Sequence, residues 1–558
     1  MIAFLSNINI EPIKNFFKEE EVFFSGYNQF LIDLLNDNSD LYSNKISEVF
    51  LFIDLEEMLY EIFNKLPTEE TFSEADEKLN NLFSLVKSYL TKRNNVIFVM
   101  NNATKPINCF TTFIESNHAE VNFSVFVNTY NDKLKILKKE HSNLLIFDWE
   151  RIVRTFGENN LYDDKFWYLG RIKLNNNAYK NIKEEYTSLL NAYRGKIKKV
   201  LVLDLDNTIW GGVIGEDGVN GIILSEDGPG KAYRDFQKII LSLKDIGVIL
   251  ALNSKNNVTD VEEVFSSHNM MVLQYDDFVI KKINWENKAQ NLVEIADELN
   301  LGMDSIVFID DNPVEREFVK KNLPVVTVPD YPPDISKLKK WFFTNVVYKY
   351  FPKISLTNED KTKTRQYVSN IKRNELGKNL TLNDFLKGLE IKLKVYVNPT
   401  SFNSRIAQLT QKTNQFNMTT RRYTEGDIEN FIADKDISVF AIEYSDKFNS
   451  EGIVGTAFIK LQNEEIKIDT FLMSCRIIGK SIEFIFLYEI LCYFEKKNIR
   501  KVIAEFIPTK KNIVGKNFYG NCGFEKTIEN EFESDYSNLL LELKNKYFKN
   551  NIKVEVIE

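Results

Sequence analysis

Short apolar runs alternate with longer charged stretches along the first part of the chain. Over residues 1–190 the apolar runs at 49–55, 96–100 and 144–147 have the length and side-chain branching of buried strands. The stretches between them are amphipathic and rich in charge, as surface helices are. Strands that alternate with helices in this way predict an α/β fold.

The same alternation is clearer over residues 195–350, and it changes after about residue 365. Strands are predicted in the middle segment at 200–203, 248–252, 271–273, 306–309 and 325–328, with a helix over 286–298. Later strands are predicted at 390–397, 437–444, 455–461, 465–471 and 501–506, with a helix over 481–496. Pro332-Pro333 and the polar run at 356–364 mark the boundary. We therefore expect three domains over residues 1–190, 195–350 and 365–558, two of them α/β and the last mixed α+β.

Length, charge and cysteine usage narrow the classes of function. A chain of 558 residues is too long for one hydrophobic core. The net charge of −9 argues against a general nucleic-acid binder. We find neither a leader-like amino terminus nor an apolar stretch that could span a bilayer, so we expect a cytoplasmic protein with no membrane partner. The four Cys lack the paired spacing of a disulfide framework or a zinc site.

Four polar signals stand in chain order along the middle segment, and the first three are an acidic pair, a serine and a lysine. Asp204 and Asp206 come directly after the apolar run at 199–203. Ser254 ends the next predicted strand, and Lys288 stands near the start of a helix. One carboxylate can attack a phosphoryl group and the other can shuttle a proton, while a hydroxyl and an ammonium hold the phosphate. Together they indicate phosphoryl transfer at the carboxyl end of a parallel sheet.

A second acidic pair, Asp310-Asp311, follows the predicted strand at 306–309. Taken alone, such a pair is more often a helix cap than a metal site. Its place after the three other signals favours a site for Mg²⁺, which binds through few carboxylates and keeps several waters.

The residues 203–212, 253–257 and 308–316 resemble the signatures of the haloacid dehalogenase (HAD) superfamily, and most closely its FkbH-like branch. This resemblance implies a doubly wound parallel sheet without a large cap, and a small flap at 210–224. It implies Asp204 as phosphoryl acceptor and Asp206 as acid/base. The phosphate would be held by Thr208, Ser254 and Lys288. The Mg²⁺ ligands would be Asp204, the Asp206 carbonyl, Asp310 and Asp311.

Cys475 and the turn Arg476-x-x-Gly479-x-Ser481 stand between a predicted strand and an apolar helix. Such a turn can present backbone N–H groups and a helix dipole to an anion. A thiol beside an arginine near a helix start ionises more readily, and thiolate is the nucleophilic form. A buried structural cysteine is the alternative. The turn, with a Gly-Phe motif at residues 519–525, resembles the pantetheine-binding signature of GNAT acyltransferases. The polar block at 405–417 adds Asn414 and Gln415 as acyl or pantetheine contacts.

The amino-terminal segment resembles SGNH hydrolases more loosely. Ser6 and Asn101 stand roughly where that fold has its Ser and Asn, but Trp167 replaces the catalytic His. We therefore expect a degenerate SGNH-like domain that serves structure or partner docking rather than hydrolysis.

The FkbH-like resemblance implies a two-site enzyme. Cys475 would capture a phosphoglyceryl group from 1,3-bisphosphoglycerate, the phosphatase site would remove the phosphate, and the glyceryl group would pass to the phosphopantetheine arm of an acyl carrier protein. Two alternatives stay open. One is a phosphatase fused to an acyl-CoA-dependent N- or O-acyltransferase, in which Cys475 is structural. The other is a non-catalytic scaffold that docks a carrier protein.

Overall fold

The computed structural model describes most of the chain, in two compact units. The described residues are 1–65, 68–105, 113, 117, 123–356, 360, 365–369, 373, 376, 381–462, 464–474, 477–528, 530–547 and 552–557. The first unit comprises Met1–Leu190 and Thr424–Asp427, and the second comprises the rest. Within the described residues, none of the helices combines the length and the apolar character that a membrane span requires.

The first unit is built on a five-stranded parallel sheet in the order β2-β1-β3-β4-β5. The strands are β1 (Ile2–Ser6), β2 (Val22–Phe24), β3 (Glu48–Phe52), β4 (Ile97–Asn101) and β5 (Leu144–Phe147). Every residue of β1 and β3 is buried, as expected for a parallel sheet covered on both faces. The strands predicted at 49–55, 96–100 and 144–147 are thus confirmed, within two or three residues at their ends.

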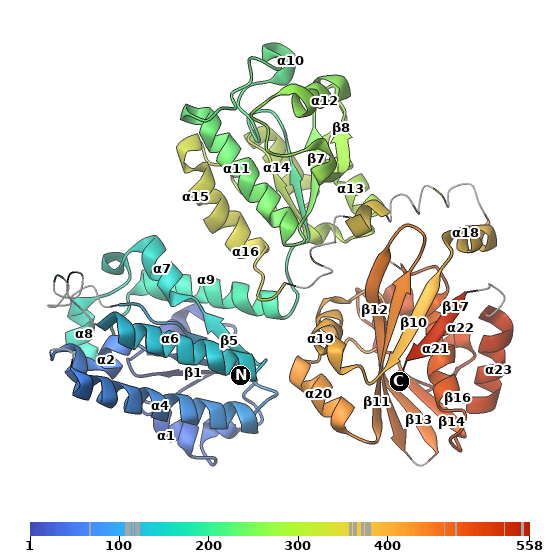
Figure 1. Cartoon of the computed structure of the whole chain (residues 1–558), viewed down its shortest axis with the longest axis horizontal. Helices are drawn as coiled ribbons and strands as arrows, with labels where there is room; N and C mark the ends of the chain where they lie inside the picture. Colours follow the sequence, from blue (N-terminus) through green and yellow to red (C-terminus); the bar gives the residue numbers. More distant parts are fainter. Residues whose placement is uncertain are drawn as a thin grey trace. The chain divides into compact units, whose positions relative to one another are not determined.

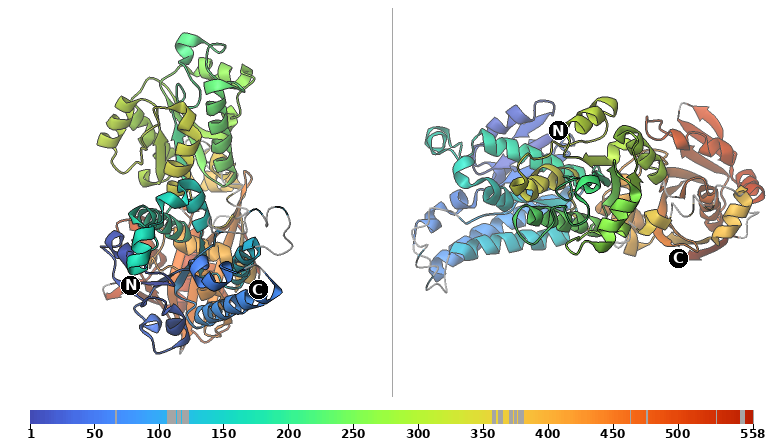
Figure 2. Two further views of the ribbon diagram at one scale, coloured as in Figure 1. Left: turned by 90° about the vertical axis from the view of Figure 1, so that its left-hand side faces the viewer. Right: turned by 90° about the horizontal axis from the view of Figure 1, so that it is seen from above.

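Helices follow the strands of this sheet. Two long helices, α4 (Glu69–Lys92) and α6 (Phe123–Glu140), pack against each other (Figures 1 and 2). The others are α1 (Phe30–Leu35), α2 (Leu55–Met58), α3 (Tyr60–Phe63), α7 (Trp149–Phe156), α8 (Asp164–Gly170) and α9 (Asn176–Tyr193). The core combines aliphatic side chains with buried aromatic ones, for example Tyr89, Phe98 and Tyr130.

A second parallel sheet, in the order β8-β7-β6-β9, lies in the second unit. Its strands are β6 (Val200–Leu203), β7 (Ile249–Ser254), β8 (Phe278–Ile283) and β9 (Ile306–Ile309). Its helices are α10 (Ile214–Asp217), α11 (Gly228–Asp245), α12 (Val258–Ser267), α13 (Lys288–Leu299), α14 (Pro313–Asn322), α15 (Leu338–Phe342) and α16 (Tyr348–Tyr350). Residues of α11 and α12 pack on one face of the sheet, and residues of α13 and α14 pack on the other. This confirms the doubly wound sheet.

Two strand predictions in this segment are wrong. Residues 271–273 form a turn, and β8 forms instead at Phe278–Ile283. The edge strand β8 carries Lys281 and Lys282 on positions that are only partly buried, so its sequence lacks the apolar run that marks a central strand. Residues 325–328 contribute a single parallel bridge, between Thr327 and Val307, because only Thr327 bonds the backbone of β9.

A mixed sheet of eight strands follows, in the order β15-β16-β14-β13-β12-β11-β10-β17. Its strands are β10 (Lys392–Val397), β11 (Ile437–Ser445), β12 (Ser450–Gln462), β13 (Glu465–Met473), β14 (Lys501–Glu505), β15 (Glu525–Ile528), β16 (Glu531–Asp535) and β17 (Lys553–Ile557). Its helices are α18 (Leu382–Leu389), α19 (Asn403–Lys412), α20 (Glu425–Ala433), α21 (Ile482–Tyr493), α22 (Phe518–Cys522) and α23 (Tyr536–Tyr547). All five predicted strands and the predicted helix are present, so the mixed α+β character is confirmed.

The parallel strands β13 and β14 separate before β13 ends. Their pairing stops at Ile468 and Ala504, whereas β13 continues to Met473. The chain itself fills the gap: the Met418 N–H donates to the Phe471 carbonyl (3.0 Å), and the Ile507 N–H donates to the Met418 carbonyl (2.8 Å). The exposed backbone edge that diverging strands leave is therefore satisfied internally.

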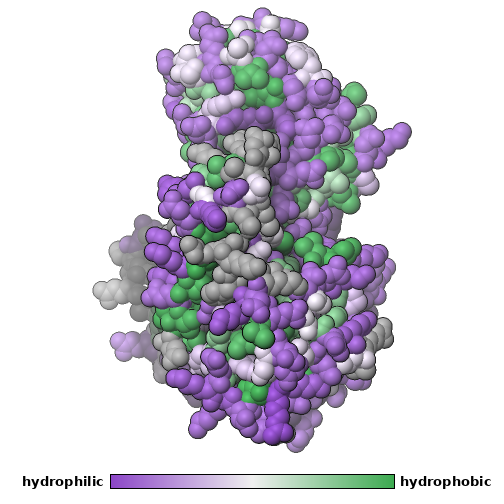
Figure 3. Space-filling view, turned by 90° about the vertical axis from the view of Figure 1, so that its right-hand side faces the viewer, coloured by the Kyte–Doolittle hydropathy of each residue, from purple (hydrophilic) through white to green (hydrophobic). Residues whose placement is uncertain are grey.

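Apolar side chains on the surface are scattered rather than concentrated on one face. Figure 3 shows one such face, on which hydrophilic residues predominate and hydrophobic residues form small separate patches. Single exposed apolar residues of this kind are normal for globular proteins.

Candidate functional site

The strongest candidate site lies at the carboxyl ends of β6, β7 and β9. Asp204 directly follows β6, Ser254 is the last residue of β7, and Asp310 directly follows β9. Because neighbouring parallel strands end at the same edge, these three side chains converge there. Lys288 is the first residue of α13 and reaches the same point. All four residues are buried, with at most 6% of their surface exposed.

Lys288 lies between two carboxylates. Its Nζ is 2.9 Å from Asp204 Oδ2 and 2.6 Å from Asp310 Oδ2. The Ser254 hydroxyl donates to Asp204 Oδ1 at 2.6 Å. Burial alone would lower the pKa of Lys288, but Asp204 and Asp310 outweigh it and raise that pKa above its ordinary value. The ammonium is therefore a fixed positive charge at the end of β6.

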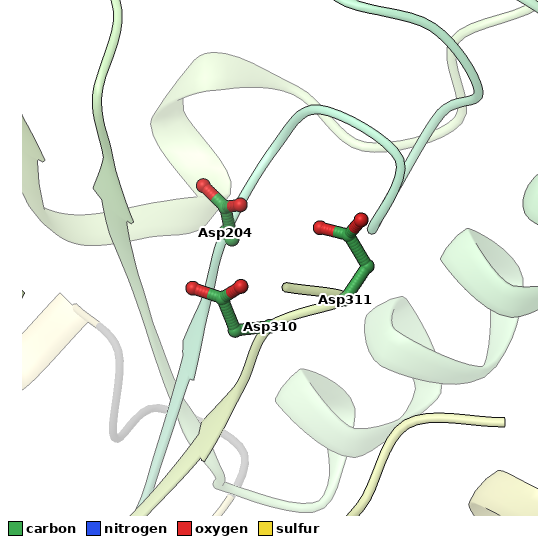
Figure 4. Close-up of side chains that lie close together, drawn as sticks. All are labelled: Asp204, Asp310 and Asp311. Atoms are coloured by element: carbon green, nitrogen blue, oxygen red, sulfur yellow. The ribbon is translucent and has the colours of Figure 1, made fainter. Parts of the chain in front are cut away.

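Three carboxylates form a compact acidic cluster at this edge. Asp204, Asp310 and Asp311 each offer an oxygen within 4.8 Å of the others, and Figure 4 shows their carboxylates turned toward one another. Burial, then the charge of Asp204, raises the pKa of Asp310 to about 6 and also raises the pKa of Asp311. Crowded hard oxygen ligands with one compensating lysine suit a small divalent cation.

Asp206 is turned away from the acidic cluster. Its Oδ1 accepts hydrogen bonds from Trp210 Nε1 (3.0 Å) and from the Ile214 N–H (3.1 Å), and its Oδ2 accepts one from Asn256 Nδ2 (3.0 Å). Burial raises its pKa despite these donors. The Asp206 side chain therefore does not join the acidic cluster. Its backbone carbonyl remains the predicted ligand.

Thr208 joins the first acidic motif to the last. Its hydroxyl donates to Asp311 Oδ1 (3.3 Å) and accepts from the Asp311 N–H (3.1 Å). The Tyr331 hydroxyl donates to the Thr208 carbonyl at 3.0 Å. With both hydrogen-bonding roles of its hydroxyl used, Thr208 orients Asp311 in this structure. Phosphate binding by Thr208 stays a prediction.

An ion pair connects the loops that carry Ser254 and Asp311. Lys255 Nζ lies 2.6 Å from Glu315 Oε1. Arg316, the next residue of α14, donates from one nitrogen to the carbonyls of Asp310 (2.9 Å) and Asp311 (2.5 Å). The start of α14 therefore contacts both the loop after β7 and the loop after β9.

Sequence reasoning missed the residues that bond the side chain of Asp206, the predicted acid/base. Trp210 and Asn256 lie inside the motifs already noted, but nothing in their spacing shows that both point at Asp206. Asn256 could have been found from the sequence. It stands two positions after Ser254, and residues at that spacing in an extended chain point to the same side. The segment predicted as a flap, 210–224, forms a short loop that carries α10. A bridge between Gly211 and Ile223 closes this loop.

The second predicted site is only partly described. Cys475 and Arg476 lie outside the described residues. Gly479 (φ +83°) and Ser481 (φ +61°) both adopt left-handed backbone, which turns the chain sharply into α21. Ser481 is the residue before that helix, and its side chain caps no N–H group.

Asn414 and Gln415 directly precede the segment that fills the gap between β13 and β14. The Asn414 side-chain oxygen accepts a hydrogen bond from Arg422 at 2.5 Å. Asn512 Nδ2 donates to the Asn417 carbonyl at 3.0 Å and so fixes the segment from its other side. The structure thus places both predicted contacts beside the separated strands, and acyl or pantetheine binding by them stays a prediction.

The amino-terminal residues of interest lie at the carboxyl edge of the first sheet. The Ser6 hydroxyl accepts from the Ile8 N–H (3.1 Å), and the side chain of Asn101 bonds the backbone of Ile53. Trp167 lies against Lys173, whose Nζ is 5.9 Å from the ring centroid. The non-hydrolytic role of this unit stays a prediction.

Comparison with known proteins adds to this geometry. Residues 15–191 match the family described as FkbH, N-terminal domain. The N-terminal part of the protein BF1531 from Bacteroides fragilis, a structure containing a phosphatase domain complexed with Mg, is 28% identical at a TM-score of 0.57, covering 64% of this chain and 94% of that chain. A mutant of the spermidine N-acetyltransferase SpeG from Vibrio cholerae is 15% identical at a TM-score of 0.22, covering 27% of this chain and 96% of that chain. No curated protein matches the chain.

The order of the second sheet, its acidic edge and the likeness to a phosphatase-containing chain place residues 200–309 in the HAD class of phosphatase domains. The amino-terminal match covers the segment that precedes this domain. The chain is thus similar to FkbH proteins in its amino-terminal segment and, over 64% of its length, to a chain that contains a phosphatase domain.

Proposed function

We propose that this chain is a bifunctional enzyme that captures a phosphoglyceryl group on Cys475, dephosphorylates it and transfers the glyceryl group to the phosphopantetheine of an acyl carrier protein. The observation that carries the phosphatase half is Lys288 between Asp204 and Asp310, with Ser254 bonded to Asp204. The acyl-transfer half is supported by the position of Cys475 in the sequence, immediately before the turn into α21.

In the phosphatase half, an Asp204 oxygen attacks phosphorus, and the bond from phosphorus to the glyceryl oxygen breaks. Asp206 gives its proton to that leaving oxygen. Water then attacks the aspartyl-phosphate, and Asp206 takes the proton that the water loses. Ser254 and Lys288 hold the phosphoryl oxygens throughout.

The acidic cluster fits Mg²⁺, the cofactor of this site. Asp204, Asp310 and Asp311 would hold it, together with the Asp206 carbonyl. When bound, the cation neutralises negative charge on the phosphoryl group. The Mg in the similar Bacteroides fragilis structure supports this choice.

In the acyl-transfer half, the Cys475 thiolate attacks the acyl carbon of 1,3-bisphosphoglycerate and expels phosphate, so that a thioester forms. After dephosphorylation, the carrier thiol attacks the same carbon and releases Cys475. An acyl phosphate is already activated, so neither step requires a further energy source.

The experiment is intact-mass analysis of the full chain after exposure to 1,3-bisphosphoglycerate and Mg²⁺. The wild type is expected to carry a glyceryl adduct, and Asp204→Asn is expected to carry the heavier phosphoglyceryl adduct. Cys475→Ala should carry neither, whereas Cys492→Ala, a matched control elsewhere in the same domain, should behave as wild type. A persistent adduct on Cys475→Ala would refute the acyl-transfer half.

A phosphatase fused to an acyl-CoA-dependent acyltransferase is the second candidate. Residues 416–418 use the backbone groups in the gap between β13 and β14, so a pantetheine arm cannot lie there as an added strand, whether it belongs to CoA or to a carrier protein. Transfer from acyl-CoA in the absence of any carrier protein would favour this candidate instead.

A further inference from the structure

A pocket lined by four lysines lies at the amino-terminal edge of the second sheet, opposite the acidic cluster. Lys199 directly precedes β6, and Gly247 and Val248 directly precede β7. Lys199 stands five residues before Asp204, about 16 Å along an extended strand, so this pocket is separate from the acidic edge. All of its residues belong to the second unit. Its lysines define what we term the lysine pocket: Lys198, Lys199, Lys353 and Lys412.

Two glycines bring distant segments together around the lysine pocket. Gly195 has φ +66°, and a Cβ on it would lie 2.5 Å from Lys412 Cγ. Gly247 has φ +89°, and a Cβ on it would lie 2.7 Å from the Asp360 carbonyl. A side chain at either position would collide with these neighbours, and residues other than glycine rarely adopt such φ values. The glycines therefore allow Lys412, the last residue of α19, to approach the segment before β6.

The lysine pocket holds more positive charge than its carboxylate neutralises. Lys353 Nζ pairs with Asp360 Oδ1 at 2.7 Å, and both side chains are largely buried. Across the described parts of the chain, neither Lys199 nor Lys412 makes an ion pair or a hydrogen bond through its ammonium. Ammonium groups that are partly withdrawn from water and lack such partners are costly, and a bound anion removes that cost.

Lys412 shows the effect of this imbalance. Burial lowers the pKa of Lys412 to about 7, and the charge of Lys353 lowers it further, while Asp360 opposes the change. Lys288 at the acidic edge is the opposite case, because its two carboxylates raise its pKa despite burial. The fold therefore compensates the lysine at one edge of the sheet and leaves the lysine at the other edge without a counterion.

The end of α19 does not account for Lys412. A lysine in the last turn of a helix can bond the free carbonyls there. In this helix Arg422 has that role, since it donates to the carbonyls of Thr410 and Thr413. The ammonium of Lys412 is thus not required as a helix cap.

Lys198 adds a second ammonium with little compensation. Its Nζ donates to the backbone carbonyl of Asp304 at 2.6 Å, whereas the carboxylate of Asp304 pairs with Lys511 at 3.1 Å. Burial lowers the pKa of Lys198, and the charge of Asp304 opposes this only in part. A ligand with more than one negative charge would satisfy Lys198 and Lys412 together.

The size of the lysine pocket and its donor type indicate a phosphate group. Its empty space of about 340 Å³, part of which is open to solvent, suits a small ligand. Lysines bind phosphate as point charges, whereas planar carboxylates are matched best by the forked donors of arginine. None of the described residues that line the pocket is an arginine.

We propose that the lysine pocket is a second anion site of this protein, and that it takes a phosphate group, either as inorganic phosphate or on a small phosphate ester. Lys198, Lys199 and Lys412 are its contacts. This site goes beyond the proposed function, because it lies at the opposite edge of the sheet and requires neither Mg²⁺ nor Cys475. The bound phosphate joins the segment before β6 to the end of α19.

The test is isothermal titration calorimetry of inorganic phosphate into the full chain with EDTA present. Without a divalent cation, three carboxylates outnumber one ammonium at the acidic edge, so phosphate is disfavoured there. We expect one phosphate per chain. Lys412→Met and Lys198→Met should each weaken binding by about tenfold, the loss usual for one hydrogen bond to a charged group. Their free energies of unfolding without phosphate should not fall, which separates lost binding from lost folding.

Lys281→Met is the matched control. Burial also lowers the pKa of Lys281, but this residue lies on the edge strand β8 outside the lysine pocket, so phosphate affinity should be unchanged. Lys288→Met should likewise leave it unchanged. Weaker binding in Lys288→Met with normal binding in Lys412→Met would overturn the inference. The same heat from sodium chloride at equal ionic strength, or no binding to the wild type, would also overturn it.

Glycerol 3-phosphate, titrated in the same way, identifies the source of the phosphate group. Tighter binding of this ester than of inorganic phosphate would support a small phosphate ester as the ligand, and the reverse order would support the free ion. In both cases Lys412→Met should weaken binding, and an unchanged affinity of Lys412→Met for both ligands would exclude the site.

Discussion

Lys288 illustrates how burial gives a single residue its role. An ammonium almost out of solvent is costly unless carboxylates compensate it, and Asp204 and Asp310 do so at 2.9 and 2.6 Å. The same three groups keep one another in place, so the lysine side chain spaces the two carboxylates. Electrostatic preorganisation of this kind is often the largest contribution to catalysis.

Replacing Lys288 by Met should lower the rate of Mg²⁺-dependent phosphate release by about 10²–10³-fold, the loss usual for one preorganised donor. The reason is that the phosphoryl group loses its cation while two buried carboxylates are left facing each other. Lys282→Met is the control, since Lys282 pairs with Glu294 and Glu298 instead. Near-normal turnover in Lys288→Met would contradict this role.

At the scale of elements, the site depends on how the loops after parallel strands are joined. Lys255 follows β7 and Glu315 lies on α14, and their ion pair ties the loop of Ser254 to the loop of Asp310 and Asp311. A displacement of about 1 Å in a reacting geometry can cost about 10²-fold in rate. The ion pair is therefore expected to position catalytic groups without touching the substrate.

Charge reversal tests this connection. Lys255→Glu and Glu315→Lys should each reduce kcat by about tenfold, because like charges push the two loops apart. The double variant should recover most of the rate, since the pair re-forms with its charges exchanged. The measurement is kcat for a phosphate monoester in all four combinations; a double variant no better than the worse single one would exclude positioning by the pair.

The eight-stranded sheet is stabilised by a buried ion cluster of its own. Arg373 forms a bidentate pair with Asp446 (2.6 and 2.9 Å) and also contacts Glu451 (2.7 Å). Burial alone would raise the pKa of Asp446, but bonds from Arg373 and Tyr444 outweigh it and hold that pKa below its ordinary value. Its folded-state pKa therefore lies below that of the unfolded chain.

This sign fixes a pH dependence of stability. A carboxyl group whose pKa is lower in the folded protein stabilises the fold at pH values above its pKa in the unfolded chain, about 3.9. That stability is lost as the pH falls through the lower pKa of the folded state. In urea unfolding between pH 3 and 6, the wild type should lose free energy of unfolding below about pH 4. Asp446→Asn should be less stable at pH 6 but should lose less on acidification. An equal acid-dependent loss in both proteins would contradict the assignment.

At the scale of the whole molecule, the chain separates into two units with separate cores. A ligand stabilises only the part of a protein whose folded form it binds. The acidic cluster belongs entirely to the second unit. Binding of Mg²⁺ should therefore be visible as a selective effect on unfolding.

Scanning calorimetry with and without Mg²⁺ should show separable transitions, of which only those of the second unit move upward. At about 100 times the dissociation constant the gain is about 2.7 kcal/mol. Asp310→Asn should abolish the gain, because it removes the most deeply buried of the three carboxylates. Equal movement of all transitions would show that the cation does not act through this site.

The sequence by itself determined the residues of the phosphatase site and most of the strands. Buried parallel strands are continuous apolar runs, and the candidate residues Asp204, Ser254 and Asp310 stand at their ends, with Lys288 at the start of a helix, so all four are visible without a structure. The edge strand β8 was missed because its exposed positions carry lysines, which breaks the run that marks a central strand.

Only the tertiary structure decided how these groups divide their work. Asp204 and Asp206 are two residues apart, yet one carboxylate joins the acidic cluster and the other bonds Trp210 and Asn256. The filling of the gap beside β13 by residues 416–418 also joins segments distant in sequence. Side-chain direction and long-range pairing are set by packing, which no local pattern of residues encodes.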